Sequence, residues 1–200
     1  MKVLFGLEAP DQGDIILNGQ KTTIKSPQEA ISKGIGMVHQ HFMLVPSLTV
    51  AQNIILGVAP KKGLFIDMDK AVKAAQDIAE EYNFDLDVNQ RVEEIPVGIK
   101  QKVEILKALY RGAEILILDE ATANIDSETE AIVQNSLAKM RQGRTTIAIA
   151  HRLSTIQDAN CIYVLDKGRI IEHGSHEELL ALGGTYHKMY SLQAGAMEGE

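Results

Sequence analysis

The sequence predicts an α/β fold in which helices cover a parallel sheet. Three short apolar runs, at 35–39, 115–118 and 145–150, have the length and continuity of strands that are buried on both faces. Segments with helical periodicity separate these runs, and alternation of strands with helices indicates parallel pairing. Polar side chains follow each run directly, at the edge where open α/β sheets place their ligands.

The N-terminal part of the chain predicts short elements joined by turns. Its first residues are apolar and no capping residue precedes them, so they are expected to form the tail of a helix. An Asn-Gly pair at 18–19 is a strong hairpin signal. The expected elements are a helix tail over 1–7, a strand over 14–18, a helical turn over 27–32 and a strand over 35–39 that ends at Gln40.

The middle of the chain, 49–113, is predicted to be a helical subdomain inserted into an α/β core made of 1–48 and 114–200. Alanines and other apolar residues recur there at helical spacing, and prolines and glycines separate the periodic segments. The expected helices cover 49–56, 69–82 and 100–110.

The C-terminal part is predicted to alternate between helices and strands. Ser127 and Glu130 have the spacing of a capping box, and Lys167-Gly168 reads as a turn. Cys161 lies in the apolar run CIYVL and is predicted to be a buried thiol. The expected helices run from 127 to before Gly143, over 176–182 and over 186–192, and the expected strands cover 145–150, 161–166 and 169–172.

Composition narrows the class of protein. A chain of 200 residues fits one domain, with or without a small lobe. A net charge of −7 argues against broad binding to nucleic acid or to an anionic membrane, although it does not exclude a local basic patch. One cysteine excludes a disulfide framework. No apolar run is long enough to span a bilayer, and the N-terminus is too short for a signal peptide, so a cytosolic location is expected.

Three of the predicted strands end in side chains that together suit catalysis. Gln40 follows the first run, Asp119 and Glu120 follow the second, and His151 follows the third. If the strands are parallel, these ends meet at one edge of the sheet. An acid pair, an amide and an imidazole suit metal-assisted attack of water on an anionic substrate. Each of these side chains taken alone is compatible with a purely structural role.

Four segments around these side chains resemble motifs of one protein family. ILILDE (115–120) resembles a Walker B motif with its following glutamate, and ATANID (121–126) resembles a D-loop. IAIAHRLSTIQDAN (147–160) resembles a switch-histidine segment, and GMVHQHFMLVPSLTVAQNI (36–54) is similar to a Q-loop. Together they resemble the nucleotide-binding domain of ATP-binding cassette (ABC) transporters. The resemblance implies a RecA-like P-loop NTPase core with a helical subdomain, and an ATPase that works as a homo- or heterodimer on transmembrane subunits.

The resemblance also implies roles for individual residues. Asp119 would support Mg²⁺, Glu120 would polarise the attacking water, and His151 would contact the γ-phosphate of ATP. Gln40 would touch the metal and the water, and would couple the nucleotide state to the membrane subunit. Asp126 would lie in the D-loop at the dimer interface. Catalysis of this kind consists of positioning and of electrostatic stabilisation of phosphoryl oxygens.

The phosphate-binding loop of that family does not occur within these 200 residues. The pattern GxxxxGK[ST] is absent, and MKVLFGLEAPDQGDI resembles the family's segment just after that loop, so the Walker A loop and its strand would lie upstream of Met1. Without the loop's lysine and its backbone N–H donors, ATP binding is expected to weaken by on the order of 5 kcal/mol. The chain is therefore predicted to be a truncated domain whose sheet has an unpaired edge and low cooperative stability.

The segment that aligns with the family's signature, IPVGIKQKVEILKALY (95–110), is unusual. Pro96 stands where serine is usual and has neither a hydroxyl nor an N–H, while Val97 and Ile99 replace a glycine and a glutamine. Gly98 remains as a candidate nucleotide contact at the start of a helix, whose N-terminus favours an anion. In the family, each site combines the Walker motifs of one subunit with the signature of the other. We therefore predict weak binding of ATP and Mg²⁺, and little or no ATPase activity in the isolated chain.

The two halves of the chain resemble different branches of the family. Up to Glu120 the sequence is similar to importers of simple sugars or nucleosides, and from Ala121 it is similar to exporters of drugs or lipids. A recombined or truncated gene product would explain this change, and a naturally divergent subunit is the alternative.

These observations leave two functions to separate. The first is an ATP-binding and ATP-hydrolysing subunit of an ABC transporter, peripheral on the inner face of the cell membrane. The second is a catalytically defective fragment that only binds a membrane subunit, through residues 40–56 and the helical subdomain. An ABC ATPase of DNA repair or translation would need basic surfaces, zinc cysteines or coiled-coil insertions, which a chain with one cysteine and a net charge of −7 does not offer.

Overall fold

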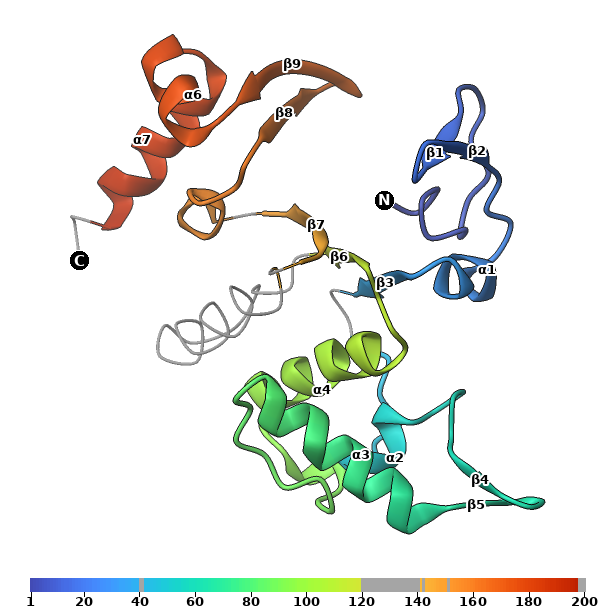
Figure 1. The fold of residues 1–200 in the computed structure, drawn as a ribbon. Coiled ribbons are helices and arrows are strands. Elements are labelled where there is room, and N and C mark those ends of the chain that lie inside the picture. Colours follow the sequence, from blue (N-terminus) through green and yellow to red (C-terminus); the bar gives the residue numbers. More distant parts are fainter. Residues whose placement is uncertain (40–41, 120–140, 142, 151, 198–200) are drawn as a thin grey trace. The chain divides into compact units, whose positions relative to one another are not determined.

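A computed structural model describes the chain except for residues 40–41, 120–140, 142, 151 and 198–200 (Figure 1). The chain divides into two compact units, Met1–Ile147 and Ala148–Glu200, which we describe separately. The helix predicted from Ser127 lies outside the described residues.

The first unit is built on a sheet with the strand order β3-β6-β7. Strand β3 (Ile35–Val38) pairs in parallel with β6 (Ile115–Asp119), with Ile35 opposite Ile115 and Val38 opposite Leu118. Strand β7 (Thr145–Ile149) lies on the other side of β6. The α/β fold with a parallel sheet is thus confirmed, and each predicted strand is found within one residue of its expected bounds.

The two faces of β3 and β6 are covered by different parts of the chain. Leu116 and Leu118 point to a cluster formed with α2, α3 and α4, which we call the lobe face. Ile117 points to a smaller cluster that contains Phe5 and Ile24, which we call the N-terminal face. This alternation follows from the geometry of a strand, whose successive side chains leave on opposite sides.

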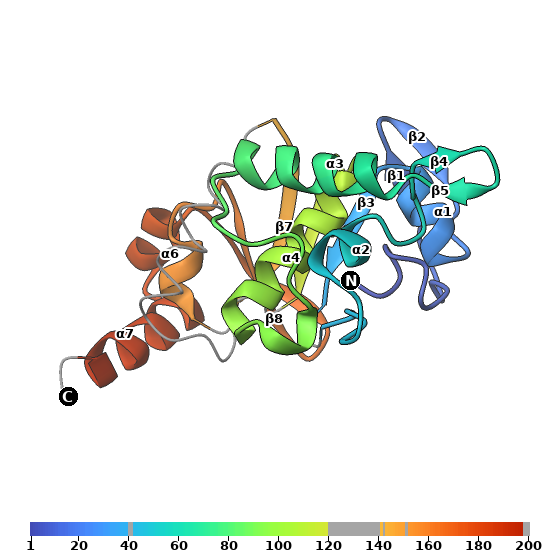
Figure 2. The ribbon, with the colours of Figure 1, turned by 90° about the horizontal axis from the view of Figure 1, so that it is seen from below.

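The helical lobe contains α2 (Val50–Ile54), α3 (Met68–Glu81), α4 (Val97–Tyr110) and a short 3₁₀ turn, Val92–Glu94 (Figure 2). Helix α3 buries Ala71, Ala75 and Ala79, which share one stripe because they are four residues apart. Helix α4 begins at Val97, three residues before the predicted start. Pro96 is its N-cap, and the extended backbone of Pro96 (φ −61°, ψ 159°) ends the preceding segment and lets the helix begin at once.

Two hairpins lie in the described part of this unit. Strand β1 (Ile15–Leu17) pairs with β2 (Gln20–Thr22) through Asn18 and Gly19, whose φ values of 51° and 75° are those of the type I′ turn that an Asn-Gly pair predicts. Strand β4 (Lys61–Lys62) pairs with β5 (Phe65–Ile66). The second hairpin was not predicted, because strands of two residues show no periodicity.

The N-terminus forms a single turn rather than the expected helix tail. The Phe5 N–H donates to the Met1 carbonyl, as in a helix, but Gly6 has a φ of 73° and ends the turn. A Cβ at Gly6 would lie 2.6 Å from the Ser26 carbonyl oxygen, so this close approach requires glycine. Ser26 also caps α1 (Pro27–Ser32), the predicted helical turn.

The second unit is an antiparallel pair packed against two helices. Strands β8 (Ile162–Asp166) and β9 (Arg169–Gly174) are joined by the predicted turn at Lys167-Gly168. The other elements are a 3₁₀ turn (Leu153–Ile156), α6 (His176–Leu182) and α7 (Thr185–Met197). A small core forms between them from Leu153, Ile162, Val164, Leu179 and Tyr186.

The prediction of a buried thiol at Cys161 is wrong, since the side chain is exposed. In β8 the buried side chains are Ile162 and Val164, which point to the core. Cys161 has the opposite parity and therefore leaves the strand on the open side. A strand that is buried on one face can have the same apolar composition as a strand that is buried on both faces, so composition did not distinguish the two cases.

In the described part of the chain, no helix is both long enough and apolar enough to cross a bilayer.

Candidate functional site

The predicted site lies where β3 and β6 end together. Because these strands are parallel and in register, the chain leaves both of them at the same edge of the sheet. Asp119 is the last residue of β6 and is half-buried there. Gln40, Glu120, Asp126 and His151 lie outside the described residues, so their predicted roles stay predictions. The structure therefore places one of the predicted catalytic and metal-binding residues, Asp119, at the predicted edge.

Gly98 lies on another element, in the first turn of α4. The N–H groups of Ile99 and Lys100 both donate to the Pro96 carbonyl oxygen at 3.0 Å, and no side chain caps the helix. Val97, which replaces a glycine of the signature, is 48% exposed. No hydrogen bond among the described residues joins this turn to Asp119. An uncapped first turn that faces solvent offers N–H donors and the positive end of a helix dipole to an anion.

A buried ion pair on α4 holds the segment that follows Gln40. The Glu104 carboxylate accepts from the Met43 N–H at 2.6 Å, and Lys107 Nζ donates to the Met43 carbonyl oxygen at 2.8 Å. Nζ of Lys107 lies 3.8 Å from the Glu104 carboxylate, and both side chains are buried. Burial lowers the pKa of Lys107, and the Glu104 charge opposes that shift. The pair thus fixes both backbone groups of one residue, whatever side chain stands there.

Asn53 on α2 fixes the same segment two residues later. Its Oδ1 accepts from the Val45 N–H at 2.8 Å, and its Nδ2 donates to the carbonyls of Val45 at 3.1 Å and Thr49 at 3.0 Å. The Asn53 side chain is fully buried. Buried amides with several partners are costly to remove, because each partner loses its bond without gaining water.

Sequence reasoning missed Asn53, Glu104 and Lys107. A signal for the last two is present, since two opposite charges three residues apart lie between the apolar positions of α4. That spacing is also common on exposed helix faces. It therefore indicates a structural ion pair only once the burial of Glu104 and Lys107 is known.

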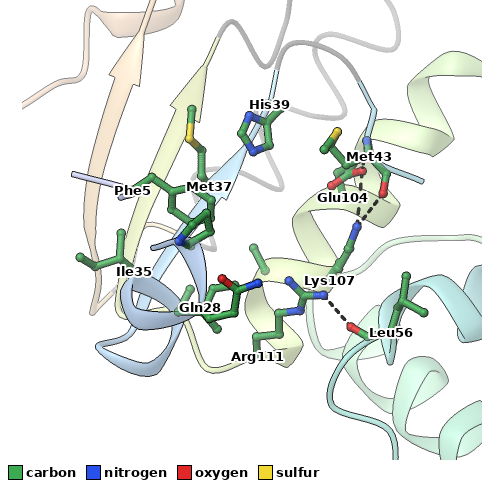
Figure 3. Close-up of a pocket in the computed structure, with 15 residues that line it drawn as sticks. Phe5, Gln28, Ile35, Met37, His39, Met43, Leu56, Glu104, Lys107 and Arg111 are labelled. Atoms are coloured by element: carbon green, nitrogen blue, oxygen red, sulfur yellow. Dashed lines mark hydrogen bonds and ion pairs between the residues drawn. The ribbon is translucent and has the colours of Figure 1, made fainter. Parts of the chain in front are cut away.

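A cavity of about 310 Å³ lies beside this segment, between β3, α1 and α4 (Figure 3). His39 and Met37 line one side of it, and Lys107 and Arg111 line the other. His39 packs edge-on against Phe5 with the ring centres 5.8 Å apart. Arg111 donates to the Leu56 carbonyl oxygen at 2.5 Å, while its buried Nε has no partner among the described residues. The cavity therefore combines apolar walls with charged groups on one side, where the Glu104 carboxylate lies beside the cations of Lys107 and Arg111.

Comparison with known proteins agrees with the motifs. A family profile described as ABC transporter matches residues 1–123. The ABC transporter ATP-binding protein exp8 of Streptococcus pneumoniae is 55% identical over 175 residues, which are 85% of this chain and 29% of that protein. The nucleoside import ATP-binding protein NupA of Lactococcus lactis subsp. cremoris is 38% identical over 197 residues, which are 98% of this chain and 38% of that protein.

A solved structure has the same fold. A bacterial Atm1-family ABC exporter with ATP bound matches with a TM-score of 0.73 at 34% sequence identity, over 96% of this chain and 34% of that chain. Relatives of the importing and of the exporting kind therefore both match, as the two kinds of motif predicted. The chain spans between 29% and 38% of the length of these three proteins.

Proposed function

Because this chain belongs to the ABC transporter family, we propose that it acts as an ATP-binding part of a transporter and drives substrate movement across a membrane. One observation carries the proposal. The parallel pairing of β3 with β6 puts the Q-loop-like segment and Asp119 at the same edge of the sheet. An edge of this kind is where α/β proteins bind nucleotides.

Asp119 suits a magnesium ion that accompanies ATP. Mg²⁺ prefers oxygen ligands and is commonly held by one or two carboxylates together with phosphate oxygens of the substrate. A half-buried carboxylate at a strand end fits that pattern. When bound, the ion would neutralise charge on the phosphates. Four other residues are proposed to act with Asp119. Glu120 would polarise the attacking water, and His151 would contact the γ-phosphate. Gln40 would touch the metal and the water, and Asp126 would lie at the dimer contact.

Gly98 is proposed to act on a second nucleotide, held by another nucleotide-binding domain. The first turn of α4 is uncapped and lacks acidic residues, so an anion meets N–H donors and no repulsion. Pro96 gives this turn fewer donors than serine would, because proline has neither a hydroxyl nor an N–H, and the proposed contact is accordingly weak.

Transmembrane subunits are the proposed partners, at the cytoplasmic face of the membrane. The segment after Gln40 is tied to α4 through Glu104 and Lys107, and to α2 through Asn53. A partner that contacts this segment would therefore move α4 with it, and the signature turn at the start of α4 would move as well. Through this connection, movement of the membrane subunit during transport would be coupled to the nucleotide site.

Calorimetry with MgATP tests the proposal. Binding by the chain, abolished in Asp119→Asn and retained in the control Asp77→Asn, at an exposed carboxylate on α3, is the expected result. Because GxxxxGK[ST] does not occur in these 200 residues, we expect binding to be several thousand-fold weaker than in an intact domain. Phosphate release at about one turnover per second from the same chain would contradict the predicted weakness. Equal binding by Asp119→Asn would contradict the role of that residue.

A second function, binding to a membrane subunit without ATP, is favoured by Pro96, which has neither the hydroxyl nor the N–H that a signature serine would offer to a phosphate. The two functions differ in one measurement. If the chain captures a membrane subunit equally well with and without MgATP, and calorimetry detects no nucleotide binding, the second function holds and the first fails.

A further inference from the structure

The β4–β5 hairpin presents apolar side chains to solvent at its tip. Leu64 is 99% exposed, Phe65 80% and Ile66 54%. Gly63, with a φ of 64°, opens the two-residue turn and lets the chain reverse within Gly63-Leu64. The hairpin projects beyond α2 and α3 (Figure 1). Adjoining apolar side chains that are exposed to this degree indicate an interaction surface.

Two lysines stand directly across the hairpin from these side chains. Lys61 is opposite Ile66 and Lys62 is opposite Phe65, and both lysines are exposed. Each face of the hairpin therefore carries one apolar side chain beside one cation. A lysine stem can lie along apolar surface while its ammonium group stays at a polar level.

The hairpin is basic although the chain is acidic. Residues 57–66 contain two lysines and no acid, whereas the whole chain has a net charge of −7. The next acid, Asp67, faces the start of α3, where it accepts from the Lys70 N–H at 3.2 Å and pairs with Lys70 Nζ at 3.4 Å. The Asp67 N–H donates to the Pro60 carbonyl oxygen and closes the base of the hairpin. The acid is thus engaged at the base, mainly with Lys70, although its charge also reaches Lys62.

We propose that this hairpin inserts Leu64 and Phe65 into the surface of an anionic phospholipid bilayer, with Lys61 and Lys62 on the lipid phosphates. A convex tip with apolar side chains on both faces suits a deformable lipid interface, and the lysines supply the charge complementarity. The acidic remainder of the chain confines the contact to the hairpin. The inference rests on the proposed function in one respect, that the chain works beside a membrane.

The absence of tryptophan makes the contact directly measurable. Phe65→Trp introduces a single tryptophan. With vesicles of equal parts phosphatidylcholine and phosphatidylglycerol, its emission is expected to shift to the blue and the protein to float with the vesicles. Each lysine near an anionic surface contributes about fivefold to partitioning, so Lys61→Gln with Lys62→Gln is expected to lower binding by about 25-fold at low salt.

The β1–β2 hairpin supplies a matched control. Ile16 is 69% exposed and stands opposite Lys21, but that hairpin has the polar tip Asn18-Gly19. Ile16→Trp is expected to show no blue shift with the same vesicles. Leu64→Ser with Phe65→Ser is expected to abolish flotation while the circular dichroism spectrum stays unchanged, which excludes misfolding as the cause.

Three results would overturn the proposal. The first is an emission shift in the Ile16→Trp protein equal to that in the Phe65→Trp protein, and the second is binding to pure phosphatidylcholine vesicles equal to that with the anionic vesicles. The third is a shift of the Phe65→Trp emission that grows with protein concentration in the absence of vesicles, which would report self-association. None of these measurements involves nucleotide. Loss of lipid binding with intact MgATP binding removes this inference alone, and loss of MgATP binding with intact flotation removes the proposed function alone.

Discussion

The lobe face and the N-terminal face are two sides of the same strands, yet they are covered very differently. On the lobe face, Leu116 and Leu118 pack in a large cluster with helices α2, α3 and α4. On the N-terminal face, Ile117 packs with Phe5, Ile24 and the short helix α1. The cavity of about 310 Å³ borders Phe5 and Met37 on the second face and Ala108 and Ala113 on the lobe face, so it does not distinguish the two. Burial in this sheet is therefore set by the covering layer and not by the strand sequence.

The largest expected effect separates the two faces directly. Leu116 and Ile117 are neighbours and are both almost fully buried. Leu116→Ala should lower the free energy of unfolding by about 4 kcal/mol, because helices on the lobe face cannot collapse into the cavity that it leaves. Ile117→Ala should cost about 2.5 kcal/mol, because the smaller cluster on its face gives fewer contacts to lose.

Urea unfolding followed by circular dichroism measures both variants. The exposed Leu192→Ala, on α7, serves as the control and should change the unfolding midpoint little. Equal costs at Leu116 and Ile117 would contradict the difference between the faces.

The second test removes the Asn53 hydrogen bonds on the lobe face and leaves its apolar core unchanged. Asn53→Ala leaves the Val45 N–H without its hydrogen-bond partner, while the Val45 and Thr49 carbonyls lose the side-chain amide but keep the N–H groups of Leu48 and Asn53. The expected cost is about 2.5 kcal/mol, since the Val45 N–H loses its hydrogen bond and two carbonyls each lose one of their donors. Hydrogen exchange of the Val45 amide should accelerate more than that of amides in β6.

Asn89→Ala, at an exposed asparagine, is the matched control and should leave the unfolding free energy within about 0.5 kcal/mol of its original value. An Asn53→Ala protein as stable as this control would mean that water replaces the lost bonds at Val45.

Much of this architecture was predictable from the sequence, and the rest was not, for physical reasons. The Asn-Gly turn, the Lys167-Gly168 turn and the apolar strands 35–38 and 115–119 are local signals, and local backbone chemistry decides them. The burial of Glu104 and Lys107 depends on Met43, which lies more than sixty residues away in the chain. The exposure of Cys161 depends on which face of β8 receives a cover, and the sequence of one strand does not contain that information.

Gly36 in β3 leaves little room for an added methyl group on the lobe face. A Cβ at Gly36 would lie 2.8 Å from the Ala113 Cβ and 3.2 Å from the Ala108 Cβ, so Gly36→Ala should cost about 2 kcal/mol by overpacking. Ala113→Gly removes the nearer of these atoms. The double variant should therefore be more stable than the sum of the two single changes predicts, as a double-mutant cycle with urea would measure. Strict additivity would show that the backbone, and not the neighbouring methyl group, absorbs the added atom.

The smallest effect lies outside both faces, in the second unit, and it depends on pH. The Glu172 carboxylate on β9 accepts from the N–H groups of Tyr186 and Thr185 at the start of α7, and these bonds lower its pKa below the usual 4.5. A lowered pKa means that the bonds stabilise the fold fully above pH 4.5, and that this stabilisation is lost as the pH falls through the folded pKa. Glu172→Gln should therefore speed hydrogen exchange of the Tyr186 amide at neutral pH, with the difference from the original protein closing in acid. Amides of β3 and β6 should not respond, and Glu177→Gln, an acid in the first turn of α6, is the matched control. A difference that persists unchanged below the folded pKa would mean that the geometry of the glutamate, and not its charge, holds the start of α7.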